Sequence, residues 1–112
     1  MNDDQYNLTF LFYPDDEGSG KLVGHCLEMD IVALGDSIQE CCKLLKELIN
    51  VQLDAAENLH TRDTLFRPAP AKYWRMLARA NKLSPEDIEL QPREVRVRAC
   101  VDSIKYNSLV PA

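Results

Sequence analysis

The chain has 112 residues, which is enough for one domain and leaves little room for a second. Apolar residues make up 46% of it, which supports a packed core and argues against disorder. Lys and Arg total 13 against 18 Asp and Glu, so the net charge is −5. Phosphate backbones repel such a chain, so non-specific nucleic-acid binding is disfavoured and a basic protein partner would suit it better.

The chain shows no targeting or membrane-spanning pattern. Its first ten residues carry neither a basic leader nor a long apolar stretch, and no run approaches the ~18 apolar residues of a membrane span. The four cysteines lack the spacing of a disulfide framework. The sequence therefore predicts a cytoplasmic protein with reduced thiols and no membrane contact.

Three strands are predicted in the first 34 residues. From Asn7 to Tyr13 apolar side chains recur at every second position, with Leu8, Phe10 and Phe12 on one face. The glycines and Pro14 that follow predict a turn, after which Lys21 to Leu27 returns as a second strand. Ile31 to Leu34 is a third, short strand. Together they predict an antiparallel meander.

A long helix is predicted from about Ser37 to Asn58. Ser37 and Glu40 have the spacing of a capping box, in which each side chain satisfies a free backbone N–H. At ~1.5 Å per residue the helix is roughly 33 Å long. A stripe of apolar residues at helical spacing predicts that it packs across the sheet. The stripe comprises Ile38, Cys41, Cys42, Leu45, Leu48, Ile49, Leu53 and Ala56.

The rest of the chain, from residue 61 onward, predicts shorter elements. A proline-containing loop from Thr61 to Ala71 leads into a short helix from Ala71 to Asn81. Ser84 and Pro85 are typical of another helix start. Residues Glu94 to Val101 alternate, with Val95 and Val97 facing inward and Arg96 and Arg98 facing outward, so a half-buried strand that joins the sheet is predicted there.

The segment from Gly24 to Cys41 resembles the signature of the HicB family. The most specific part is the spacing from Cys26 through Glu28 to Gly35-Asp36-Ser37. The resemblance covers about Leu8 to Leu53, although Met29-Asp30-Ile31 stands where the family often has a proline-rich bend. It implies a β-β-β-α-β fold described as partly ribonuclease-H-like, and a role as an antitoxin that covers the active surface of a small RNA-cleaving HicA toxin.

Two parts of the family pattern bear on the rest of the chain. HicB-like domains pair, so the resemblance implies a homodimer. Many members also carry a DNA-binding segment, whereas Pro92 and the final strand occupy the place of a recognition helix here, so no clear DNA-binding segment is present.

The predicted architecture is α+β. An antiparallel sheet of three to four strands carries one long helix on a face. Residues 1–60 form the HicB-like core, and residues 61–112 form a C-terminal extension of the same domain whose strand completes the sheet.

The sequence predicts no catalytic, cofactor-binding or metal-binding residue, and the protein is predicted not to be an enzyme. Neighbouring Cys41 and Cys42 are interpreted as small buried hydrophobic residues, because adjacent helical positions lie about 100° apart. His25 could act as a general base, but no nucleophile or phosphate-binding loop accompanies it. A small hydrolase remains an alternative, with Glu28 and Asp30 as its only pair of carboxylates beside strands.

The predicted function is that of a HicB-like antitoxin or an orphan relative, which acts by steric occlusion of a protein partner. Leu11 and Tyr13 are predicted to lie on an uncovered face of the sheet, where a second copy or a partner would bind. Trp74 is predicted as an interface anchor. Arg96 and Arg98 are further candidates, either for an acidic partner or, as an alternative function, for nucleic acid.

Overall fold

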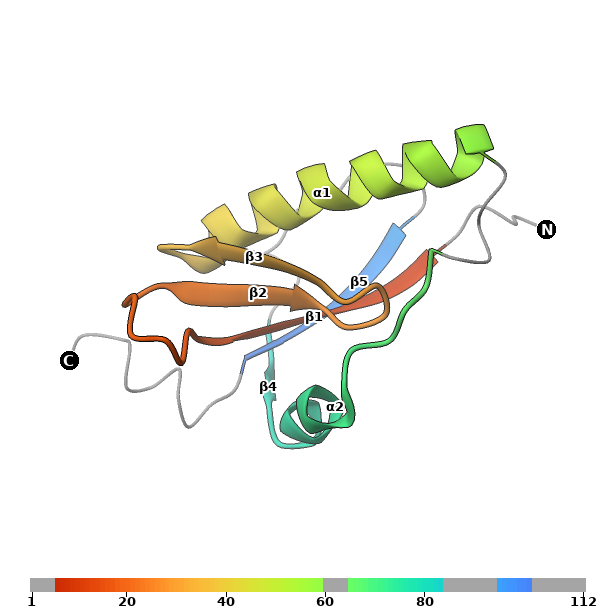
Figure 1. The fold of residues 1–112 in the computed structure, drawn as a ribbon. Helices are drawn as coiled ribbons and strands as arrows, with labels where there is room; N and C mark the ends of the chain where they lie inside the picture. The colour runs from red at the N-terminus through yellow and green to blue at the C-terminus, as the bar shows by residue number, and fades with distance from the viewer. Residues whose placement is uncertain (1–5, 60–64, 84–94, 102–112) are drawn as a thin grey trace.

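The protein folds into one five-stranded mixed sheet with a helix on each face (Figure 1). The computed structural model describes residues 6–59, 65–83 and 95–101. The sheet contains β1 (Tyr6–Pro14), β2 (Leu22–Cys26), β3 (Ile31–Gly35), β4 (Asn81–Lys82) and β5 (Val95–Val101). The helices are α1 (Ile38–Leu59) and α2 (Ala71–Ala78). The strand order is β3-β2-β1-β5-β4.

The predicted meander and the final strand are confirmed, with two differences in the sheet. Strands β1, β2 and β3 pair antiparallel in succession, as the alternating patterns predict. Strand β5 lies beside β1 and runs parallel to it from Tyr6↔Val95 to Phe12↔Val101, so the sheet is mixed and not purely antiparallel. The fifth strand, β4, was not predicted, because its two residues carry no alternating pattern. The predicted helix start at Ser84 and Pro85 lies outside the described residues.

The start of α1 follows the capping-box prediction in part. The Glu40 backbone N–H donates to Ser37 Oγ at 3.1 Å, as expected. The Glu40 carboxylate accepts from the N–H of Asp36 at 3.0 Å, one residue before the predicted donor. Both bonds satisfy backbone groups at the helix terminus that have no partner within the helix.

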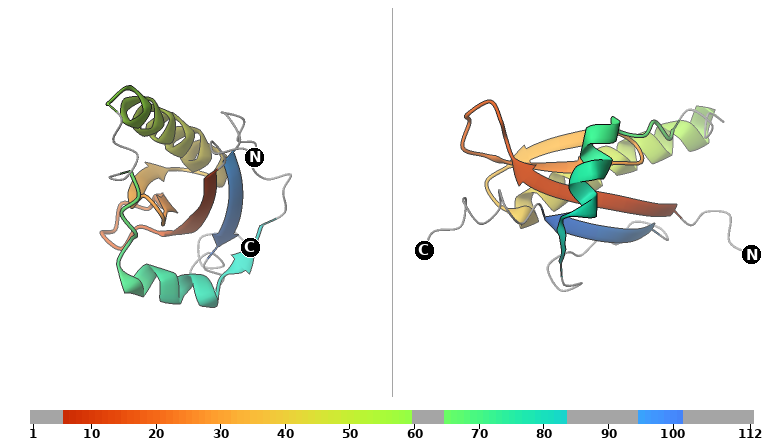
Figure 2. Two further views of the ribbon diagram at one scale, coloured as in Figure 1. Left: turned by 90° about the vertical axis from the view of Figure 1, so that its right-hand side faces the viewer. Right: turned by 90° about the horizontal axis from the view of Figure 1, so that it is seen from below.

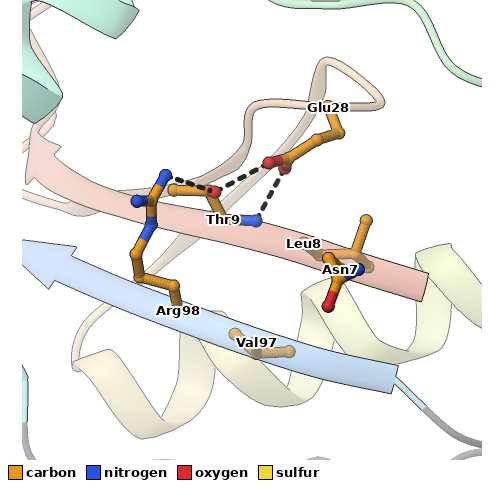
Figure 3. A pocket seen from close by; sticks show the side chains of 6 residues that line it. All are labelled: Asn7, Leu8, Thr9, Glu28, Val97 and Arg98. Carbon is orange, nitrogen blue, oxygen red and sulfur yellow. Dashed lines mark hydrogen bonds between the residues drawn. The ribbon is translucent and has the colours of Figure 1, made fainter. Parts of the chain in front are cut away.

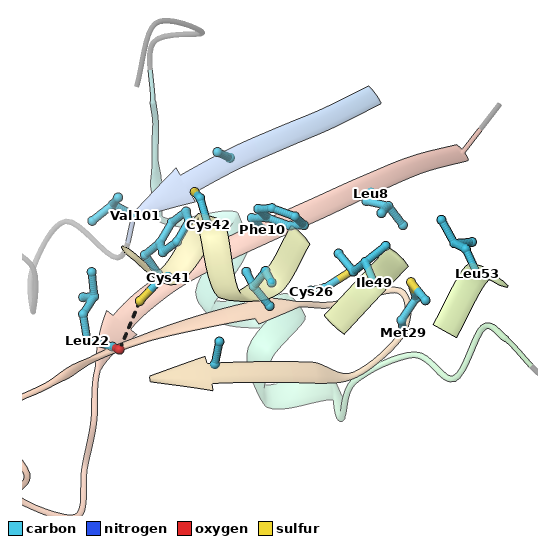
Figure 4. Close-up of a cluster of buried hydrophobic side chains, with 14 of the residues drawn as sticks. Leu8, Phe10, Leu22, Cys26, Met29, Cys41, Cys42, Ile49, Leu53 and Val101 are labelled. Carbon is cyan, nitrogen blue, oxygen red and sulfur yellow. Dashed lines mark hydrogen bonds between the residues drawn. The ribbon is translucent and has the colours of Figure 1, made fainter. Parts of the chain in front are cut away.

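The larger core lies between α1 and one face of the sheet (Figure 4). Leu8, Phe10 and Phe12 from β1 are almost completely buried there. The helix contributes the buried residues Cys41, Cys42, Leu45, Ile49, Leu53 and Ala56. Gly24 permits this approach: an added Cβ would lie 2.9 Å from Cβ of Cys41, below any normal contact distance.

A second core lies on the opposite face, beneath α2, as the left view of Figure 2 shows. It contains Leu11, Tyr13, Val23, Leu27, Ala69 and Cys100. Tyr73, Trp74, Met76, Leu77 and Ala80 pack against these residues. The prediction that this face is uncovered is therefore wrong, because the apolar residues of α2 pack against it.

Candidate functional site

His25 links three aromatic and acidic side chains beneath α2. Its Nδ1 lies 2.9 Å from the Tyr13 hydroxyl, and its Nε2 lies 2.7 Å from Oδ1 of Asp30. The ring of Tyr73 on α2 meets the imidazole edge-on, with 4.6 Å between centroids. An ionised carboxylate only accepts, so Nε2 carries the proton, and in the neutral ring Nδ1 accepts from the Tyr13 hydroxyl.

This arrangement ties α2 to the sheet. His25 is 1% exposed, and both of its ring nitrogens have protein partners. Burial, followed by the neighbouring Tyr73, raises the pKa of Tyr13 well above its usual range, so its hydroxyl keeps the proton. A general base needs a free nitrogen within reach of a substrate proton. His25 therefore serves here as a structural link between β1, β2 and α2.

Asp30 connects this buried group to the surface. It is a non-glycine residue with a positive φ of 52°, a conformation that Asp adopts more readily than most residues. Its side chain is 43% exposed and borders a hollow of about 460 Å³. The hollow is lined by Met29, Asp30, Ile31, Gln52, Leu65 and Arg67. Asp30, with its carboxylate, and Arg67, with its guanidinium, thus line the same hollow where β3 begins.

A second polar group lies where β2 ends (Figure 3). Both oxygens of Glu28 accept from Thr9, one from the backbone N–H at 2.6 Å and the other from the hydroxyl at 2.7 Å. Nη2 of Arg98 on β5 donates to the same hydroxyl oxygen at 3.2 Å. These residues, with Asn7, Leu8 and Val97, line a hollow of about 260 Å³. Glu28 and Asp30, the carboxylates of the hydrolase alternative, therefore bond separately to Thr9 and His25.

The structure disperses the residues predicted to bind a partner. Leu11 is 0% exposed and Tyr13 is 7% exposed, so the prediction that they are surface residues is wrong, because α2 covers them. Trp74 is half-buried against the same core and donates its indole N–H to the Ala69 carbonyl at 3.0 Å. Arg98 is exposed on the α2 face of the sheet. Arg96 pairs in register with Asn7, and its side chain lies outside the described part.

The four cysteines Cys26, Cys41, Cys42 and Cys100 are free thiols in buried positions, as the core interpretation predicts. Burial raises the pKa of the Cys26 thiol to about 12 and that of the Cys42 thiol to about 12. Thiols with such pKa values stay protonated near neutrality and are poor nucleophiles. Within residues 6–59, 65–83 and 95–101, no three His, Cys, Asp or Glu side chains are grouped to hold a metal ion.

An apolar surface that the sequence did not predict flanks β3, the outermost strand. Val32 and Leu34 are 48% and 45% exposed on the α2 face of the sheet. On the other face, Leu48 and Val51 of α1 are 43% and 63% exposed, and Leu44 is partly buried. The prediction that Leu48 belongs to the buried stripe is therefore wrong, because its position on the helix turns it past the edge of the sheet. We call these five residues the β3–α1 surface. It brings exposed apolar side chains to both faces of one sheet edge.

The position of the α1 residues follows from helical geometry. Cys41 contacts the glycines of β2 and β3, whereas Cys42 lies toward Phe10 and Val101 (Figure 4). Successive helical residues turn by about 100°, and Leu44, Leu48 and Val51 continue round the helix on the Cys41 side. They therefore overhang the free edge of β3. The sequence contains this signal, because Leu44, Leu48 and Val51 widen the apolar side of the helix beyond the buried stripe.

None of the helices in the described ranges has the length and apolar character needed to span a membrane.

Comparisons of the chain with protein-family models, with curated proteins and with solved structures find no match.

Proposed function

We propose that this chain is a cytoplasmic, non-catalytic protein-binding domain, either a HicB-like antitoxin or an orphan relative. The observation that most supports the proposal is the β3–α1 surface. Monomeric proteins usually protect an edge strand, and here Val32 and Leu34 extend the apolar area of α1 across such an edge. A partner that adds a strand beside β3 would cover both groups of side chains.

Charge favours a basic partner at this surface. The exposed carboxylates of Asp36, Glu40 and Glu47 stand near it or on the same helix, and the whole chain has a net charge of −5. A small RNA-cleaving toxin of the HicA type, the partner class implied by the sequence resemblance, must bind phosphate and therefore carries basic groups. Such complementarity would accelerate association and weaken with salt. Binding would inhibit the toxin by covering its surface.

The test is inhibition of RNA cleavage by a HicA-like toxin at increasing molar ratios of this chain. We expect inhibition to be complete near a one-to-one ratio and to be lost in Val32→Lys, which places a charge in the surface. Asn58→Lys adds the same charge at an exposed position near the C-terminal end of α1 and should inhibit like the wild type. Cleavage that proceeds unchanged with excess wild-type chain would contradict the proposal.

Nucleic-acid binding is the second candidate, and exposed Arg98 is the observation that favours it. The carboxylate of Glu28 lies in the same hollow and opposes an approaching phosphate. Titration with duplex and single-stranded oligonucleotides at two salt concentrations separates the two candidates. Binding that weakens with salt and is lost in Arg98→Ala would favour this alternative over the protein-binding role.

A further inference from the structure

The hollow where β3 begins holds two opposite charges that do not pair with each other. Its volume is about 460 Å³, and among the described residues that line it Asp30 and Arg67 carry the charges. Within the described part of the chain, the guanidinium of Arg67 has no hydrogen-bond or ion-pair partner. Small-molecule sites are commonly hollows of roughly 300–1,000 Å³. This one has the size of a ligand site and two charged groups that a ligand can reach.

Asp30 is held in place by a buried partner. Nε2 of His25, which is 1% exposed, lies 2.7 Å from Oδ1 of Asp30. That bond uses one carboxylate oxygen, and the other can accept from a ligand. The φ of Asp30 is 52°, a left-handed conformation that the surrounding structure has to maintain. The carboxylate is therefore oriented before a ligand arrives, which lowers the cost of binding.

Arg67 lies on a segment that is fixed on both sides of it. Leu65 is buried in the larger core, and Ala69 is buried in the second core, where its N–H donates to the Leu27 carbonyl at 2.7 Å. Between them the chain crosses from the α1 side of the sheet to the α2 side, beside the turn that joins β2 and β3 (Figure 1). The backbone of Arg67 is thus positioned, while its side chain is exposed to solvent.

The remaining lining is apolar apart from one amide. Met29 and Leu65 are buried and Ile31 is half-buried, so their side chains form an apolar wall. Gln52 of α1 is exposed and offers both a donor and an acceptor. An apolar group placed against this wall is removed from water, which favours binding. The hollow therefore combines an anion, a cation, an amide and an apolar surface.

We propose that this hollow binds a small zwitterion, namely an α-amino acid with an apolar side chain. The guanidinium of Arg67 donates to the carboxylate of the ligand, and the ammonium group of the ligand donates to Asp30. The apolar side chain packs against Met29, Ile31 and Leu65. The site goes beyond the proposed function and shares no residue with the β3–α1 surface, so either proposal can fail without the other.

Charge selects a zwitterion over a ligand with a single charge. A carboxylate without an amine is attracted by Arg67 but repelled by Asp30, and an amine without a carboxylate meets the reverse. A singly charged ligand also removes water from one charged group of the hollow without supplying a partner for it. A zwitterion pairs with both groups at once, so losing either ligand charge should cost affinity.

NMR titration of the whole chain tests the site with three probes of related shape. The probes are L-leucine, isocaproate, which lacks the amino group, and isoamylamine, which lacks the carboxylate. We expect L-leucine to bind more tightly than either of the others by about tenfold or more, with the largest amide shifts at Asp30, Ile31 and Arg67. A chain that shows no saturable shift with L-leucine, or that binds isocaproate equally well, would overturn the proposal.

Two variants each remove one charge with little change of shape. Asp30→Asn keeps an oxygen for His25 and tolerates a positive φ. It should weaken L-leucine about tenfold and strengthen isocaproate, because the repulsion is gone. Arg67→Gln should weaken L-leucine to a similar extent and strengthen isoamylamine. Opposite changes for two probes in one variant cannot come from a loss of fold.

The matched control is Arg75→Gln, which removes the same charge from an exposed position on α2 outside the lining. It should bind L-leucine like the wild type. An affinity for L-leucine that stays unchanged in both Asp30→Asn and Arg67→Gln, or that falls equally in Arg75→Gln, would overturn the assignment of the ligand to this hollow.

Discussion

Glu28 completes the hydrogen bonding of Thr9 at the point where β2 ends. The paired register of β1 and β2 stops at Phe10↔Cys26, and the next N–H of β1 on that side donates to the Glu28 carboxylate. Thr9 is 3% exposed, and both of its polar groups bond to the Glu28 carboxylate. A side chain thus takes the place of a strand carbonyl, which gives the acid of the Cys-x-Glu segment a structural role.

Glu28→Ala should destabilise the fold. It removes the acceptors of the buried Thr9 N–H and hydroxyl, and a buried donor left unsatisfied costs about 1–3 kcal/mol. Urea unfolding monitored by circular dichroism measures the change. Glu28→Gln should retain most of the stability, since its amide oxygen accepts from the N–H and its amino group can donate to the hydroxyl.

The matched control is Glu47→Ala, which removes an exposed carboxylate from α1. Its stability should lie within about 0.5 kcal/mol of the wild type. If Glu28→Ala were as stable as this control, the carboxylate would not be the acceptor that terminates β2 pairing.

Buried thiols predict a loss of stability at alkaline pH. Burial raises the pKa of Cys26 to about 12 and of Cys42 to about 12, and burial raises that of Cys41 to about 11. An unfolded thiol titrates near pH 8.5, so between about pH 9 and 11 the unfolded chain binds fewer protons than the folded one. The unfolded state is then favoured, and the free energy of unfolding falls as pH rises.

Urea unfolding at pH 7 and pH 10 measures this dependence. Cys42→Ala removes one titrating thiol and should make the decline shallower by up to about 1.4 kcal/mol per pH unit. Buried Tyr13 adds to the decline only above its usual range, because its own pKa is raised. A stability that rises from pH 7 to pH 10 would contradict thiols that are protonated in the fold.

The sequence predicts the α1 face of the fold because its signals are local. Alternation in β1, the capping residues before α1 and the apolar stripe of the helix each depend on neighbouring residues. Burial of Leu45, Ile49 and Leu53 confirms most of that stripe, whereas Leu48, which was predicted to belong to it, is 43% exposed. The parallel pairing of β5 with β1 is not local, since nothing in the alternation of Val95 to Val101 specifies its neighbour or direction.

The candidate site depends on the docking of α2 and on hydrogen bonds between distant residues, which the sequence predicts least well. A helix with apolar residues on two sides, as in α2, did not reveal which face of the sheet it would cover, so Leu11 and Tyr13 were placed on the surface. The bonds of His25 and Glu28 join residues up to 19 positions apart, and no spacing rule indicates them. The second apolar arc of α1 was readable, because Leu44, Leu48 and Val51 recur at helical spacing.

His25→Ala should loosen α2 from the sheet. It removes the hydrogen bond between the imidazole and the Tyr13 hydroxyl and the ring that Tyr73 contacts, so we expect a loss of about 1–3 kcal/mol. Hydrogen exchange of the α2 amides and the fluorescence of Trp74 report on docking of the helix. Faster exchange confined to α2, with β1 and α1 protected as before, is the expected pattern; unchanged exchange would show that His25 does not hold the helix.

Leu45 and Leu48 offer a matched comparison of burial on one helix. Leu45 is 0% exposed and Leu48 is 43% exposed, three residues further along α1. Leu45→Asp places an unpaired charge in the larger core, at a cost of several kcal/mol against a total stability of about 5–15 kcal/mol, so the variant should be unfolded. Leu48→Asp makes the same chemical change in a helix of the same propensity and should keep the fold. Thermal melting followed by circular dichroism measures both, and a wild-type melting curve for Leu45→Asp would mean that α1 packs through a different face.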